Sequence, residues 1–486
     1  MRKIIQQLVT GAGVLGLSVS VAHADFVDPK TFPICAAHMS PSGAPALNPD
    51  SPIQALTKAC DGELFGCDIT LDAVKGKPDP AFAGFFPDLM YYTGVNDKGH
   101  CVQRVASIKQ IYEGAVAFGV PDLKDKLIDQ IDSDEKLTEL NCQAKQEVVR
   151  ALWYLGDVTA ADAMIASYNN LLCTPHHFNE TVSRIADWPL SDAQLDAIEK
   201  TCVDGIFGEK IRNHKDALKG CYLFFATRAK ASDDALEYLK MGATNDKYAL
   251  MALASADPKG EKKRFEKILE EQTTDGFSRD AKGTLTKKKI KIYRGGRDET
   301  VSAAVALVAA GDAGGMAAVK YWLELYGNTL ASADGFERIF LWGAPFADAA
   351  TQAKLRPLLE KAFAAAEKAG AKEDSTALSV ARAAVGLGQI GSNKGINAIV
   401  EAISGDNDER RDSVLPAIGG VTNVFGTFRW GRVGLKFGGK TGLQAADGQK
   451  IVDALEKKAK FFKGDTRKQA IRAMLDIKSR MKVAGV

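Results

Sequence analysis

One segment of the sequence matches a phosphate-binding pattern. Residues 434–441 read Gly-Leu-Lys-Phe-Gly-Gly-Lys-Thr and fit Gly-x-x-x-x-Gly-Lys-Ser/Thr, in which backbone amides and the lysine hold the phosphates of a nucleotide. That chemistry needs a buried strand before the loop and a helix that starts at Lys440. The preceding residues 428–433 form a poor buried strand, and the next helix is expected only from Asp447 and Gly448. The sequence therefore predicts no nucleotide and no other cofactor.

Histidine and cysteine are the other residue types that could carry chemistry. Cys173 and His176, with His177 beside them, could supply metal ligands, but the chain has no Cys-x-x-Cys pair, and we predict no metal site. Neither Gly-x-Ser-x-Gly nor His-Glu-x-x-His, two patterns typical of hydrolases, occurs. We predict a non-catalytic protein. The alternative hypothesis is an envelope enzyme whose active site lies in the cysteine- and histidine-containing first half of the chain.

The eight cysteines predict disulfide bonds. All of them lie before residue 222, and an even number of cysteines in an exported chain is typical of disulfide pairing. Cys142 and Cys173 flank an expected antiparallel pair of helices, so these two are predicted to form a bridge. A similar argument pairs Cys202 with Cys221 across the intervening loop. The remaining four cysteines allow three pairings, and the choice stays open: Cys35, Cys60, Cys67 and Cys101.

A basic stretch at residues 282–297 could dock an anionic partner. Residues Thr286–Tyr293 can alternate as a short strand, which Gly295 and Gly296 would end. Two hypotheses remain: a solvated loop, or electrostatic docking to an acidic protein or an anionic envelope polymer. The stretch contains no acidic residue, and its seven cations are Lys282, Lys287, Lys288, Lys289, Lys291, Arg294 and Arg297.

A second basic stretch lies in the glycine-rich residues 419–442. Val433, Leu435 and Phe437 recur at every second position, which predicts a β-hairpin or an extended loop inserted between helices. The alternatives are again a solvated loop and a basic, aromatic contact surface for an anionic partner. The residues predicted to form that surface are Arg429, Trp430, Arg432 and Lys436.

The first 24 residues have the pattern of a secretory signal peptide. Arg2 and Lys3 precede an uncharged apolar stretch, residues 8–21, and Ala22, His23 and Ala24 form a small-x-small cleavage site. The apolar stretch is too short for a membrane-spanning helix. We therefore expect export to the periplasm, the cell surface or the extracellular space of a Gram-negative bacterium.

Overall composition excludes several classes of protein. The 486 residues are 46% hydrophobic and 26% charged, which excludes a mostly disordered chain, a collagen-like fibre and a polytopic membrane protein. Without residues 1–24 the chain has 61 basic and 61 acidic residues, so no global attraction to nucleic acid is expected. No later stretch approaches 18 uncharged apolar residues, so we expect a protein that is not embedded in the membrane.

The elements that would position these residues are predicted to be helices. Residues 25–100 hold nine of the 16 prolines and predict an irregular, disulfide-tied region with short helices. Residues 101–230 predict a disulfide-stapled helical region, and residues 231–486 predict cysteine-free helical repeats.

Several helix pairs look like copies of one unit. Each has an Ala/Leu-rich helix, a Gly or Asp at the bend and a second amphipathic helix. One such hairpin cannot bury its apolar face alone, so the copies are expected to stack. The copies are predicted at residues 148–171, 249–269, 301–325 and 377–403.

These units resemble the HEAT-like repeat family, particularly its short bacterial form, over roughly residues 140–480. The resemblance implies a mainly α fold: an α-solenoid of helix hairpins that binds other macromolecules and carries no catalytic residues. We therefore expect an exported scaffold that binds an envelope protein or another envelope macromolecule.

Overall fold

The structure is a computed structural model, and it describes residues 67–84, 86, 108–132, 139–167, 185, 188–207, 215–279, 285–294, 297–329, 333–370, 374–418, 435–438 and 442–486. Within these residues the protein is mainly helical, as the sequence predicts, and a single two-stranded antiparallel sheet interrupts the helices. The expected signal peptide and most of the proline-rich region lie outside the described residues.

The first half of the described chain contains α-helices of 4 to 17 residues. Its elements are α3 (Asp68–Val74), α4 (Pro80–Ala83), α6 (Ile108–Ala117), α7 (Leu123–Asp132), α8 (Glu139–Leu155), η2 (Val158–Ala160), α9 (Ala161–Ala166), α11 (Asp192–Lys200), η4 (Thr201–Phe207), α12 (Lys215–Arg228) and α13 (Asp233–Gly242).

The second half contains the pair of strands and the longest helices. Its elements are α14 (Lys247–Ala256), α15 (Lys262–Glu271), β1 (Thr273–Arg279), β2 (Leu285–Tyr293), α16 (Asp298–Ala309), α17 (Ala313–Thr329), α18 (Ala333–Arg338), η5 (Ile339–Gly343), η6 (Ala344–Phe346), α19 (Ala349–Gly370), α20 (Asp374–Gln389), α21 (Asn393–Ser404), α22 (Asp408–Ile418), α23 (Ala445–Ala459) and α24 (Gly464–Ala484).

Two of the predicted hairpins share one bend geometry. The bend between α16 and α17 uses Gly311 at φ 78°, and the bend between α20 and α21 uses Gly391, also at φ 78°. Glycine adopts this left-handed conformation without steric cost and so ends each first helix. The residue after each bend closes the turn in the same way, because Asp312 N–H donates to Leu307 O at 2.8 Å and Ser392 N–H donates to Leu387 O at 2.9 Å.

The same two hairpins also pack their helices together at matching glycines. A Cβ on Gly315 would lie 2.6 Å from Ala304 O, and a Cβ on Gly395 would lie 2.5 Å from Ala384 O. Both distances are shorter than a carbon atom tolerates, so glycine permits the close approach of the second helix to the first. Each of these glycines lies four positions after the bend glycine of its hairpin.

The core lies along the first helices of the hairpins. Every residue from Thr300 to Val308 of α16 is buried, and so is every residue from Tyr248 to Ala254 of α14. A helix that is apolar on all sides is covered on all sides. In contrast, α15 buries only Phe265 and Leu269 and presents its charged side chains to solvent.

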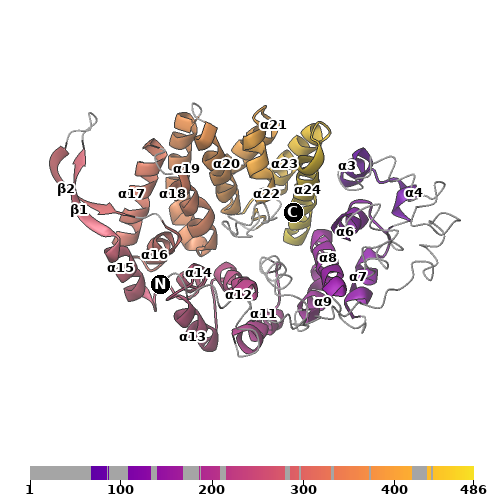
Figure 1. Cartoon of the computed structure of the whole chain (residues 1–486), viewed down its shortest axis with the longest axis horizontal. Helices are drawn as coiled ribbons and strands as arrows, with labels where there is room; N and C mark the ends of the chain where they lie inside the picture. Colours follow the sequence, from indigo (N-terminus) through magenta and orange to yellow (C-terminus); the bar gives the residue numbers. More distant parts are fainter. Residues whose placement is uncertain are drawn as a thin grey trace, which may run out of the picture.

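The last helix packs against the first described helices, so the sequence of helix contacts closes into a ring (Figure 1). Arg472 Nε of α24 donates to Glu113 Oε1 of α6 at 2.9 Å, and Arg467 Nη1 lies 3.1 Å from Asp68 Oδ1 of α3. The Ser479 hydroxyl donates to the carbonyl oxygen of Trp153 in α8. The sequence predicts stacked hairpins but does not predict this closure.

One predicted disulfide is confirmed. Cys202 in η4 and Cys221 in α12 are bridged, with their Cα atoms 5.6 Å apart. Cys142 lies in α8, but its predicted partner Cys173 lies outside the described residues, as do Cys35, Cys60 and Cys101. Cys67 is buried at the start of α3.

None of the helices in the described ranges combines the length and the apolar composition needed to cross a bilayer.

Candidate functional site: a basic β-hairpin

The basic stretch forms one strand of an antiparallel hairpin. The predicted strand Thr286–Tyr293 is confirmed as β2, and β1 is its partner, with Thr273 opposite Tyr293 and Phe277 opposite Lys289. We call residues 273–294 the basic hairpin. β1 was not predicted, because Asp275 and Gly276 interrupt an otherwise strand-forming segment.

The base of the basic hairpin is fixed to the helices. Arg294 N–H donates to Gln272 O at 2.6 Å, and the indole N–H of Trp322 in α17 donates to Tyr293 O at 3.0 Å. The Tyr293 ring also packs edge-on against Tyr321, with centroids 5.6 Å apart. From this anchored base the two strands project away from the helices (Figure 1). Lys289 and Lys291 therefore lie on a strand that extends away from the helices.

The projecting strands carry a strong local excess of positive charge. Residues 273–297 contain eight basic and two acidic residues. Lys289, Lys291, Arg294 and Arg297 are exposed. Lys287 and Lys288 lie within β2, but their side chains fall outside the description, as does Lys282.

One acid across the hairpin partly offsets this charge. Lys291 Nζ lies 2.7 Å from Asp275 Oδ1 on β1. The hydrogen bond and the charge of Lys291 hold the pKa of Asp275 below its usual value, and Asp275 raises the pKa of Lys291. Both side chains are well exposed, so this pair is screened by solvent and contributes little stability.

An exposed aromatic ring accompanies the cations. Phe277 is 48% exposed and lies opposite Lys289 in the register. The ring occupies the same face as Lys289 and Lys291, because side chains alternate between the two faces of a strand. The basic hairpin thus offers a charged face with an apolar contact point, which is suited to a macromolecular partner.

The second predicted basic surface is described only at one end. Lys436 is exposed, but Arg429, Trp430 and Arg432 lie outside the described residues. Its neighbour Leu435 packs so close to α20 that a Cβ on Gly388 would lie 2.7 Å from Leu435 Cδ2. Lys436 therefore belongs to a segment beside α20, whereas the basic hairpin is attached to α15 and α17.

The phosphate-loop pattern lacks the helix that its chemistry requires. The helix that follows it, α23, begins at Ala445 rather than at Lys440. Phe437 instead forms an isolated β-bridge with Leu443. Gly434 and residues 439–441 of the pattern lie outside the described residues, and the absence of a nucleotide site stays a prediction.

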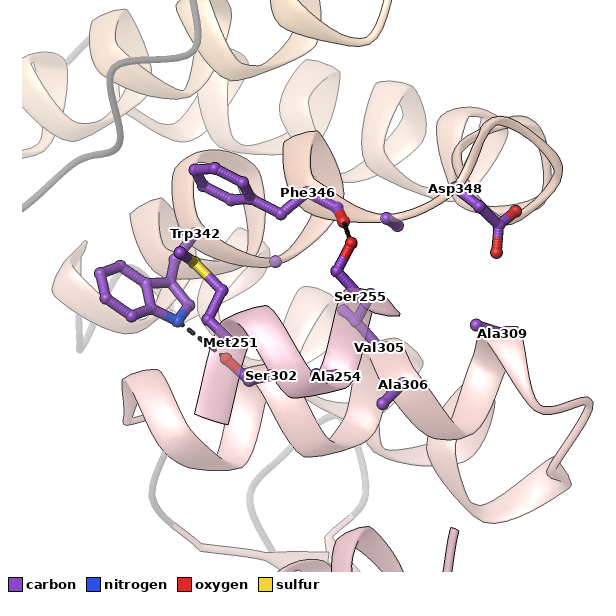
Figure 2. A pocket seen from close by; sticks show the side chains of 12 residues that line it. Met251, Ala254, Ser255, Ser302, Val305, Ala306, Ala309, Trp342, Phe346 and Asp348 are labelled. Carbon is purple, nitrogen blue, oxygen red and sulfur yellow. Dashed lines mark hydrogen bonds between the residues drawn. The ribbon is translucent and has the colours of Figure 1, made fainter. Parts of the chain in front are cut away.

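A small cavity lies where η5 and η6 meet α14 and α16 (Figure 2). Its volume of about 20 Å³ has room for roughly one water molecule. Its polar groups bond to the protein itself: Trp342 Nε1 donates to Ser302 Oγ at 2.8 Å, and the Ser255 hydroxyl lies 2.6 Å from Phe346 O. The cavity is a small gap between packed helices and is far smaller than a typical small-molecule site.

A cluster of buried charges at the ring closure was not predicted. Glu113 of α6 is 1% exposed and accepts from Arg472, while Glu147 and Arg150 of α8 form a buried pair at 2.7 Å. Lys109, partly buried beside them, has its pKa lowered to about 8, mainly by burial and then by the charge of Arg150. Sequence offers little signal for such a cluster, because its charges come from residues far apart in the chain.

Within the described ranges, no group of three or more His, Cys, Asp or Glu side chains could hold a metal ion. His176 and His177, on which the alternative enzymatic hypothesis depends, lie outside those ranges. No protein-family model, curated protein or solved structure matches this chain.

Proposed function

We propose that this protein is an exported, non-catalytic scaffold that docks an anionic macromolecule of the bacterial envelope through the basic hairpin. The observation that carries the proposal is the hairpin itself: it projects from a helical body, and the exposed Lys289 and Lys291 of β2 share a face with Phe277. A rigid body that presents a charged, partly aromatic element is suited to recognition.

The helical body supports the scaffold part of the proposal. The bends at Gly311 and Gly391 have the same backbone geometry, and the second helix of each hairpin approaches the first at a glycine. Repeated hairpins of this kind fit an α-solenoid of HEAT-like units, an architecture that binds partners along its surface. Export by residues 1–24 would bring the basic hairpin to the anionic polymers and acidic proteins of the envelope.

A charge-removal experiment tests this function. Replacing Lys287, Lys288, Lys289 and Lys291 with Gln should weaken binding to purified lipopolysaccharide or poly-L-glutamate at least about tenfold at 0.1 M salt. Folding should change by within about 0.5 kcal/mol, because the described side chains of this set are exposed. For wild type, binding should fall as salt rises to 1 M, because the screening length shortens from about 10 Å to about 3 Å.

The matched control removes the same charge elsewhere. Lys361, Lys368, Lys394 and Lys457 are exposed on other helices, and replacing them with Gln should leave binding near the wild-type level. If the hairpin variant binds both anionic probes as strongly as this control at 0.1 M salt, the proposed function is wrong.

A further inference from the structure

The backbone of β2 alternates between groups that face β1 and groups that face away. Arg294 N–H donates to Gln272 O, so the backbone of residue 294 faces the β1 side. In an antiparallel pair the direction reverses at each residue. The backbone groups of Ile292 and Ile290 therefore face β1, and those of Tyr293, Lys291 and Lys289 face the outer edge of β2.

A second contact agrees with this alternation. The outward carbonyl of Tyr293 accepts from Trp322 of α17, which occupies the base of the outer edge. Farther along the strand, no described residue forms a hydrogen bond with the outward backbone groups of Lys291 or Lys289. The hairpin projects from the helices at this point (Figure 1), so among the described residues the edge of β2 beyond Tyr293 has no strand paired with it.

From this open edge we infer that β2 takes up an extended acidic peptide as a third strand, with carboxylates at alternate positions facing Lys289 and Lys291. The inference deepens the proposed function, on which it rests, by naming the partner class. Main-chain hydrogen bonds to the outward groups supply affinity, and alternating side chains supply specificity. An added strand with carboxylates every second residue places them on the lysine face.

The charge pattern selects this occupant over a second copy of the hairpin. Lysines on an edge strand oppose pairing with an identical strand, because like charges would then face each other. An acidic strand would instead be attracted to these lysines. The same charges therefore disfavour self-association and favour a partner of opposite charge.

A backbone-directed substitution tests the inference. Lys289→Gln and Lys289→Pro both remove the charge, but only proline removes the outward N–H, and proline is tolerated where a strand N–H faces outward. The probe is a peptide Thr-Glu-Val-Glu-Val-Glu-Thr, compared with a peptide of identical composition in which the glutamates are consecutive. We expect Lys289→Pro to bind the alternating peptide about fivefold to tenfold more weakly than Lys289→Gln.

Amide hydrogen exchange of the full chain provides a second readout. The alternating peptide should slow exchange at the outward amides of Lys289 and Lys291 at least about tenfold, and the consecutive-glutamate peptide should not. This measurement uses the wild-type protein, so it holds even if Lys289→Pro disturbs the hairpin. Thermal unfolding of both Lys289 variants checks that they fold.

The outcomes separate the two proposals. Equal binding by the Gln and Pro variants, with no exchange protection at Lys289 and Lys291, would overturn strand addition. If the four-lysine variant still loses binding to poly-L-glutamate in that case, docking by charge stands. Undiminished binding by the four-lysine variant would overturn both proposals.

Discussion

A single lysine at the ring closure carries an unfavourable charge. Lys109 lies beside Arg150 and Arg472, whose charges lower its pKa, while Glu113 and Glu147 act in the opposite direction. Burial is the largest cause, and the net effect lowers the pKa from 10.5 to about 8. The protonated form is therefore less stable in the folded protein than in the unfolded chain.

Removing this charge should stabilise the protein in a defined pH range. In Lys109→Met we expect the free energy of unfolding at pH 7 to rise by on the order of 2–3 kcal/mol, because both folded and unfolded wild type carry the charge there. Between pH 8 and 10.5 the folded state releases this proton first, so wild type gains stability relative to the variant as pH rises. Urea unfolding of both proteins across pH 7 to 10.5 measures the difference.

The test compares the free energy of unfolding of wild type with that of Lys109→Met at each pH, because the other groups titrate equally in both proteins. A constant difference from pH 7 to 10.5 would contradict the shifted pKa of Lys109. A destabilised variant at pH 7 would show that the attraction of Lys109 to the charges of Glu113 and Glu147 outweighs the cost of its burial.

Among single residues, features formed by residues close in the sequence could be predicted, whereas contacts between distant residues could not. Cys202 and Cys221 could be paired because a loop of fewer than 20 residues separates the expected helices that carry them. The cations of β2 could be identified because they are contiguous. The cluster around Lys109 could not be identified, since Glu113 and Arg472 meet only in the folded ring.

The hairpins between helices depend on glycines that permit close packing. Gly315 of α17 approaches Ala304 O and Leu307 Cβ of α16 so closely that a Cβ would lie within 2.6 Å of both. A Cβ on Gly314, its neighbour in the same helix, would lie 3.0 Å from Asp312 Oδ1, which already accepts from Gly314 N–H, and would meet no backbone atom of α16 within 4 Å.

Substitution at these two positions should give opposite results. Gly315→Ala should destabilise the protein by about 2–3 kcal/mol, because backbone atoms of α16 cannot shift without separating the helices. Gly314→Ala should change stability by less than about 1 kcal/mol, since alanine favours helix and its Cβ would not approach the backbone of α16. Chemical unfolding of both variants checks this, and equal losses would contradict the close-packing explanation.

At the scale of elements, helices and their bends were predictable and the strand partner was not. The Ala/Leu-rich runs and the bend glycines predicted the pairs α16–α17 and α20–α21 within a few residues. β2 was predicted from its alternation. β1 was missed because Asp275 and Gly276 disfavour a strand locally, and pairing with β2 overrides that preference.

The ring closure is the feature of the whole molecule that depends most on distant residues. α24 meets α3, α6 and α8 through charged and backbone contacts rather than through apolar packing alone. The arginine of this contact, Arg472, is 14% exposed, so the pair with Glu113 is largely removed from water. Removing one member of such a pair costs more than removing both.

A double-mutant cycle on this pair tests whether the ring is closed in solution. Glu113→Gln and Arg472→Gln should each destabilise the protein by about 2–4 kcal/mol, and the double variant should lose at least about 1 kcal/mol less than the sum. The exposed pair Asp275 and Lys291 is the control, with an expected coupling below about 1 kcal/mol. Additive losses at Glu113 and Arg472, measured by urea unfolding, would show that α24 is not docked on α6.

The contact between α24 and α6 joins two residues that the ribosome makes at very different times. Glu113 and Arg472 are 359 residues apart, and a ribosome adds about 5–20 residues per second. Roughly 20–70 s therefore separate the appearance of the two partners. Glu113 therefore lacks Arg472 until nearly the whole chain has been made, so the contact between α24 and α6 can form only as a last step of folding.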